Sequence, residues 1–260
     1  MSARAMGVAA IVAVGLVWLA ATEMRAQAPA GQSRGYSGPR TSDGKPDLNG
    51  IWQVFNAADW NLEPHSAEEG VPAGQGVVEG GTIPYKPEAL AKRRENYEKR
   101  ATADPISKCY LPGVPRITYV PLPFEIVQTP KHVTVAYEFA HARRIIYTDG
   151  SPHVDALEFW MGDSRGRWEG DTLVVDSNSF NDKTWFDKAG NYHSDALHVV
   201  ERYTPIDPDH INYEVTIEDP KVFGRPWKMS MVIYRRLETG LQLLDYDCVS
   251  FFRKKTNAGK

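Results

Sequence analysis

After residue 105 the chain consists of short stretches in which apolar and polar residues alternate, separated by turn sequences rich in Gly, Pro and Asp. In the stretch 132–139 every second residue is apolar, and these side chains share one face because successive residues of a strand point to opposite faces. The residues on that face are Val133, Val135, Tyr137 and Phe139. The same pattern predicts strands at 48–54, 124–129, 132–139, 144–148, 168–169, 172–176, 197–204, 210–218, 227–235 and 241–251.

Short turns join most of these strands to their neighbours in sequence. Gly170-Asp171 suits a two-residue hairpin, and Gly240 supplies positive φ in the turn before 241–251. Such a meander either closes on itself or leaves long edges exposed, and closure removes the edges. We therefore predict a closed antiparallel up-and-down calycin-like β-barrel of about eight to ten strands. A β-sandwich is the alternative, since strand spacing does not separate the two folds.

Two segments do not follow the strand pattern. Residues 56–84 are rich in Gly, Glu and Ala, which predicts an irregular surface loop. Residues 87–101 predict one helix, because Pro87 suits a first helical turn and Glu88 favours its positive end. We therefore predict a single barrel domain over 47–260 with a helical insertion near 87–101.

The first residues have the character of a secretory signal peptide. Arg4 precedes an uncharged apolar run over 6–21, and small residues follow at 26–30. The run is shorter than the roughly 20 apolar residues that span a bilayer, so a stable membrane anchor is not expected. We predict a signal peptide over 1–30, a flexible leader over 31–46, and a periplasmic or secreted location.

The bulk composition narrows the choice of partners. A net charge of −3 and a pI near 6.2 provide no electrostatic footprint for nucleic acid. The sequence has no phosphate-binding Gly loop and no dinucleotide fingerprint, so no organic cofactor is expected, and a small organic molecule is the expected partner. Cys109 and Cys248 lie far apart, and an exported chain allows either a disulfide between them or two buried thiols.

Two long segments, 149–166 and 178–195, concentrate aromatic and titratable residues between strands. Loops of this length in a compact domain are usually functional or disordered, and these hold too many aromatic residues for disorder. If both rim the same end of the barrel, they form the mouth of a small-molecule site. The candidate binding residues are Trp160, Trp185, Tyr137, Ser164 and Ser194.

Four residues of these segments are candidates for acid–base catalysis. His153 or His193 would transfer a proton, Asp187 would orient an imidazole, and Asn181 would stabilise negative charge. The alternative for each imidazole is a hydrogen bond to the backbone. Trp160 and Trp185 would hold an aromatic or sugar ring, or would anchor the loops on the barrel end.

Two further catalytic candidates depend on where the strands end and which way they face. His141 continues the apolar face of 132–139 into the lumen, or lies at an exposed turn. Glu201 is an acid or base if its strand face points inward, and a surface charge if it points outward. His193, His198 and Glu201 are close in sequence, but the spacing of the two histidines places their rings on opposite faces of a strand, so no metal site is expected.

Four segments carry a recognisable combination of residues. They are 41–52 (TSDGKPDLNGIW), 109–116 (CYLPGVPR), 168–175 (WEGDTLVV) and 193–198 (HSDALH) with Glu201 and Arg202. Together they resemble a family of exported bacterial β-rich proteins that has no established reaction. The resemblance covers most of the mature chain and implies a secreted location and a lipocalin- or calycin-like fold. It implies no catalytic residue.

The leading hypothesis from the sequence is an extracytoplasmic small-molecule enzyme that uses acid–base residues at the barrel mouth without an organic cofactor. A lyase, isomerase or cyclase is favoured over a hydrolase, because no Gly-x-Ser-x-Gly nucleophile motif is present. The alternative is a non-catalytic lipocalin-like carrier of an apolar or aromatic ligand.

Overall fold

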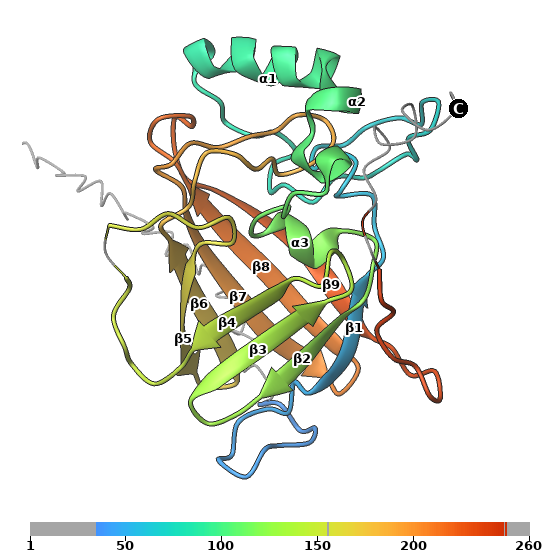
Figure 1. The fold of residues 1–260 in the computed structure, drawn as a ribbon. Helices are drawn as coiled ribbons and strands as arrows, with labels where there is room; N and C mark the ends of the chain where they lie inside the picture. Colours follow the sequence, from blue (N-terminus) through green and yellow to red (C-terminus); the bar gives the residue numbers. More distant parts are fainter. Residues whose placement is uncertain (1–34, 155, 247, 249–260) are drawn as a thin grey trace, which may run out of the picture. The chain divides into compact units, whose positions relative to one another are not determined.

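The computed structural model describes residues 35–154, 156–246 and 248 (Figure 1). The predicted signal peptide therefore lies outside the described residues. Nine strands close into one barrel in chain order, which confirms the predicted fold class. The strands are β1 Gly50–Val54, β2 Phe124–Gln128, β3 His132–Tyr137, β4 Arg143–Tyr147, β5 Asp163–Glu169, β6 Thr172–Asn178, β7 His198–Asp207, β8 His210–Glu218 and β9 Trp227–Arg235.

One pair of neighbouring strands departs from the predicted antiparallel order. β4 and β5 are parallel, with Ile146 opposite Ser164 and Tyr147 opposite Arg165. Parallel neighbours need a crossover, so the connection 148–162 runs back along the barrel before β5 begins. Only its last part lies beside the β6–β7 connection, where Phe159 bridges Phe180. The first long segment therefore meets the second only in its last part.

The barrel is closed by its first and last strands, where Trp52 lies opposite Arg235 and Val54 opposite Ile233. β9 is thus paired on both edges, by β8 and by β1, and offers no edge to a following strand. The predicted strand 241–251 is accordingly wrong over 241–246, where no strand forms. Its remaining residues lie outside the described part, apart from Cys248.

Side chains fill the barrel interior in the predicted alternation. The face that contains Val133, Val135 and Tyr137 is buried, and β8 contributes the fully buried Ile211 and Tyr213. Because both short and long apolar side chains point inward, the lumen is a packed core over most of its length.

Short helices cover one end of the barrel (Figure 1). They are η1 Pro87–Ala89, α1 Leu90–Glu98, α2 Arg100–Ala103, η2 Pro105–Lys108 and α3 Arg116–Tyr119, so the predicted helix over 87–101 is interrupted at Lys99. α3 is buried throughout: Arg116 binds Asp59 at 2.9 Å and Asp104 at 2.8 Å, and the Tyr119 hydroxyl donates to the Phe186 carbonyl at 2.7 Å. These contacts fasten α3 and the surrounding loops into a cap on the barrel end.

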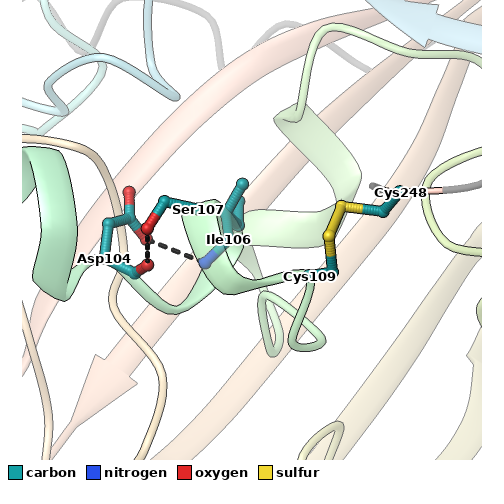
Figure 2. Close-up of a disulfide and its surroundings, with 5 residues drawn as sticks. All are labelled: Asp104, Ile106, Ser107, Cys109 and Cys248. Carbon is teal, nitrogen blue, oxygen red and sulfur yellow. Dashed lines mark hydrogen bonds between the residues drawn. A yellow bond between two sulfur atoms is a disulfide. The ribbon is translucent and has the colours of Figure 1, made fainter. Parts of the chain in front are cut away.

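Two covalent or ionic contacts tie the chain ends to this frame. Cys109 and Cys248 form a disulfide with a Cα–Cα distance of 5.5 Å (Figure 2). The predicted flexible leader is held in place over its described part, because Arg40 pairs with Asp171 in the β5–β6 turn at 2.8 Å. None of the described helices has the length and apolar character needed to cross a bilayer.

Candidate functional site

The candidate residues from the sequence lie in three separate environments. Glu201, Tyr137 and Ser164 are inside the barrel, His153 lies on its outer face, and the other candidates belong to the cap or to its turns. Each of the three environments supplies its own polar partners to the candidate residues in it.

The barrel interior holds an ion pair between Arg144 on β4 and Glu201 on β7. Arg144 Nη1 is 3.0 Å from Glu201 Oε1, and Nη2 contacts Oε2. The guanidinium also donates to Ser164 Oγ at 3.0 Å and to Ser177 Oγ at 2.9 Å. Burial by itself lowers the pKa of Arg144, but the Glu201 carboxylate raises it well above its usual value. We call these residues, with the tyrosines described next, the lumen cluster.

Three tyrosines surround this ion pair. The Tyr203 and Tyr213 hydroxyls donate to Glu201 Oε1 at 3.0 and 2.7 Å, and burial raises the pKa of both tyrosines well above the usual value. The hydroxyls of Tyr137 and Thr118 are buried next to each other and near Arg144, and neither makes a well-aligned hydrogen bond with a described residue. The cluster therefore combines a carboxylate whose interactions are nearly complete with two hydroxyls that still have hydrogen-bonding capacity.

The sequence identified part of the lumen cluster and missed its cation. Glu201 faces inward, which is one of the two predicted alternatives, and it is completely buried. Arg144 was not singled out, although it lies in phase with the inward Ile146 on β4. The alternation of inward and outward residues along β4 could therefore have identified Arg144 as an inward-facing cation.

His153 belongs to a chain of imidazoles and carboxylates on the outer face. Its Nδ1 is 2.8 Å from Asp163 Oδ2, and its Nε2 is 3.2 Å from Asp176 Oδ1. His198 Nε2 reaches the same Asp176 oxygen at 3.0 Å, and His198 Nδ1 is 3.4 Å from Glu218. Because Asp176 on β6 and His198 on β7 both point outward, this chain is separated from the lumen by the sheet.

His193 is buried in the cap and makes two hydrogen bonds. Its Nδ1 lies 2.8 Å from the Ser194 carbonyl oxygen, which can only accept, so Nδ1 carries the proton. Nε2 then accepts from the Thr184 hydroxyl at 2.6 Å. Burial lowers the pKa of His193, which keeps the imidazole neutral. His153 and His193 share no hydrogen-bond partner among the described residues, so the two candidate imidazoles lie in separate sets of contacts.

Asp187 does not orient an imidazole, contrary to the prediction. Its carboxylate accepts from the Leu62 amide at 2.9 Å, and from the backbone and side-chain amides of Asn191 at 3.1 and 2.6 Å. Burial raises the pKa of Asp187 to about 6. Asp187 therefore joins the loop at Leu62 to the β6–β7 connection.

Three further candidates have local structural roles. Asn181 Oδ1 accepts from the Lys183 amide at 3.1 Å, and Ser194 Oγ donates to Asp219 at 2.9 Å. His141 lies at the exposed β3–β4 turn with a φ of 50°, so the lumen alternative is wrong for this residue. None of the three faces the lumen cluster.

The structure brings Trp160 and Trp185 together at one groove of about 620 Å³. Tyr110 joins them, with its ring centroid 5.2 Å from that of Trp160. We call this the aromatic groove. Its other lining residues are Lys92, Glu95, Asn96, Lys99, Ala103, Pro105, Lys108, Asp182 and Lys183.

The aromatic groove carries an excess of positive charge. Its lining contains four lysines and two carboxylates, and Glu95 binds both Lys92 and Lys99, at 3.2 and 2.9 Å. Lys108 and Lys183 make no ion pair with any described residue. Two ammonium groups are therefore available to an anion. The sequence singled out the two indoles but not these lysines.

The described residues contain no group of three or more His, Cys, Asp or Glu side chains arranged to hold a metal ion. Comparisons with protein-family models and with curated proteins find no match to this sequence. The function is therefore inferred from the residues and distances of the candidate sites.

Proposed function

We propose that the protein is an exported binding protein that takes up an anionic, ring-bearing small molecule, an aromatic carboxylate or a sugar acid, in the aromatic groove. The observation that carries the proposal is the convergence of Tyr110, Trp160 and Trp185 from separate segments onto a groove with unpaired lysines. This is the carrier alternative from the sequence, with the site at the capped end of the barrel.

The chemistry of the groove matches this ligand class. Aromatic side chains offer flat apolar faces to a ring, and a few charged groups fix its orientation. Lys108 and Lys183 are point charges on flexible stems, which suits a carboxylate at varied positions. The volume of about 620 Å³ lies within the roughly 300–1,000 Å³ of small-molecule sites.

Export to the periplasm or the medium is part of the same proposal. The apolar run over 6–21 supports it from the sequence. The disulfide between Cys109 and Cys248 supports it independently, since disulfides form and persist in oxidising compartments.

The proposal is tested by calorimetric titration of the mature protein with paired probes. 2-Naphthoate and galacturonate represent the two anionic classes, and methyl 2-naphthoate and galactose are their uncharged counterparts. We expect one anion of the two to bind, and Trp160→Ala to weaken its binding by about tenfold or more. Comparable affinity for the anion and its uncharged counterpart, or binding of neither anion, would overturn the proposal.

A matched pair of lysine variants separates the groove from general charge. Lys183→Gln removes an unpaired ammonium from the groove, whereas Lys131→Gln removes one from the exposed β2–β3 turn. The first should weaken anion binding and the second should not. Equal effects would mean that the anion responds only to net charge.

An acid–base enzyme of the lyase, isomerase or cyclase type is a second candidate. It is favoured by the buried hydroxyls of Tyr137 and Thr118, which lie next to the Arg144–Glu201 pair without a well-aligned hydrogen bond to a described residue. Its test is NMR detection of product from a bound ligand, with Glu201→Gln as the variant. Turnover that is lost in a folded Glu201→Gln protein supports this candidate, and unchanged turnover overturns it.

A further inference from the structure

A second hollow lies on the other side of the helical segment that lines the aromatic groove. Its volume is about 500 Å³. Arg100, Ala101 and Asp104 line this hollow, whereas Lys99 and Lys108 of the same segment line the groove. Residues 99–108 are thus a partition between two separate spaces. We call the second one the strap cavity, after the C-terminal segment that forms one of its walls.

Four aromatic side chains contribute to the walls of the strap cavity. They are Trp60, Tyr97, Phe139 and Tyr246. Two of these rings already carry a cation on one face, since Lys188 Nζ lies 3.7 Å from the Trp60 centroid and the Arg100 guanidinium 3.9 Å from that of Tyr97. The rings therefore have fixed positions before any ligand arrives.

The lining of the strap cavity has no excess of positive charge, because Arg100, its cation outside an ion pair with a described residue, is outnumbered by two carboxylates. Lys188 is neutralised by Asp59 at 2.8 Å, and Asp104 is neutralised by Arg116 at 2.8 Å. Two further lining residues, Glu68 and Glu69, are exposed carboxylates. An uncharged aromatic molecule fits these walls, in contrast to the anion proposed for the groove.

One polar atom of the lining lacks a hydrogen-bond donor. His65 Nδ1 lies 2.8 Å from the Glu63 carbonyl oxygen and therefore carries the ring proton. His65 Nε2 is then an acceptor, and it is buried without a partner among the described residues. A buried acceptor without a donor is costly, and a ligand hydroxyl would remove that cost once the His65 ring turned Nε2 toward the cavity.

The wall that contains Tyr246 is fastened at three points. The Leu244 amide donates to the buried Glu138 carboxylate at 2.9 Å, and the Tyr246 ring packs on Phe139 with centroids 6.0 Å apart. The third point is the Cys109–Cys248 disulfide, which attaches the segment to the turn that follows Ser107 (Figure 2). We call residues 237–246, together with Cys248, the strap.

We infer that the strap cavity is a second ligand site, for an uncharged aromatic molecule with a hydroxyl group, and that the Cys109–Cys248 disulfide holds its Tyr246 wall in place. The site is independent of the aromatic groove, because the partition gives each space its own lining. The two sites also select opposite chemistry: a neutral phenol in one and an anion in the other.

The site is tested by fluorescence titration with 2-naphthol, and with naphthalene as the probe that lacks the hydroxyl. Ala101→Trp fills the cavity and should weaken 2-naphthol binding by about tenfold or more. Ala91→Trp, an exposed position on α1 outside both linings, is the matched control and should leave binding unchanged. Absence of 2-naphthol binding, or equal binding to both variants, would overturn the inference.

Two further variants test the named contacts. His65→Phe should abolish the preference for 2-naphthol over naphthalene while naphthalene still binds. Cys109→Ser/Cys248→Ser should weaken 2-naphthol binding with the melting transition of the barrel retained. The anion found to bind the aromatic groove reports on that site, so its unchanged binding in Ala101→Trp distinguishes loss of the strap cavity from loss of the groove.

Discussion

Arg144 and Glu201 form a two-pronged ion pair inside the barrel, and neither residue is more than 3% exposed. Such a pair is expensive to desolvate, and apolar residues of similar volume often replace it at no loss of stability. Replacing only one of the two residues is destabilising, because the other is left as an unpaired buried charge.

Arg144→Met should therefore lower the free energy of unfolding by about 3–5 kcal/mol. Arg144→Met/Glu201→Gln should recover a substantial part of this loss, since no buried charge remains. Urea denaturation measures both. Arg202→Met, which removes an exposed partner of Glu169, is the control and should cost about 1 kcal/mol or less. If Arg144→Met lowered the free energy of unfolding by no more than Arg202→Met, the buried ion pair would not have the energetic role described here.

The raised pKa of Asp187 should make the free energy of unfolding depend on pH in a specific way. Burial raises its folded-state pKa to about 6, above the value near 4 in an unfolded chain. The folded state thus binds more protons between these two pKa values, and the contribution of Asp187 to stability falls as pH rises from about 4 to 6. Over this window the stability of the wild type relative to Asp187→Asn should decrease by up to about 3 kcal/mol. A constant difference would show that the pKa of Asp187 is not raised.

His193 should stay neutral, with its proton on Nδ1. Burial lowers its pKa, and the Ser194 carbonyl fixes the tautomer. Long-range nitrogen–proton NMR spectra should therefore show a protonated Nδ1 and an unprotonated Nε2 at pH near 6.5, where a free imidazole is about half charged. Charged imidazolium signals for His193 at that pH would refute the assignment.

The barrel was predictable from the sequence because alternation in β2, β3, β7, β8 and β9 follows the pleat of a strand over its whole length. The parallel pairing of β4 with β5 was not predictable, because alternation shows that a strand exists and not which neighbour it takes. For the same reason 241–246 resembles a strand although β9 leaves it no free edge. The alternation within one segment does not show whether a neighbouring strand has an edge free to pair with it.

The sequence likewise predicted some residues of the candidate sites and missed others. Glu201 was a candidate because it breaks an apolar face, but its partner Arg144 lies 57 positions away and is brought near only by barrel closure. Trp160 and Trp185 stood out as aromatic residues in long loops. The lysines beside them come from α1 and the residue after it, from the last residue of η2 and from the β6–β7 connection, and surface lysines in sequence are mostly solvated.

The strap should respond to loss of its disulfide. In Cys109→Ser/Cys248→Ser the strap keeps its noncovalent contacts, among them those of Leu244, Asp245 and Tyr246 with the β3–β4 turn. Chymotrypsin should then cleave after the leucines of 237–244 severalfold faster than in the oxidised protein, because cleavage needs local release of the chain. Mass spectrometry of the fragments measures the two rates, and equal rates would show that the disulfide does not hold the strap.

The most direct test of the proposed function is the affinity of the bound anion in Lys108→Gln/Lys183→Gln, measured by calorimetry beside the wild type. The double variant removes both unpaired ammonium groups of the aromatic groove and leaves its three aromatic residues in place. We predict about tenfold weaker anion binding or more, with 2-naphthol binding unchanged. Anion affinity equal to that of the wild type would contradict the proposal that the aromatic groove is an anion site.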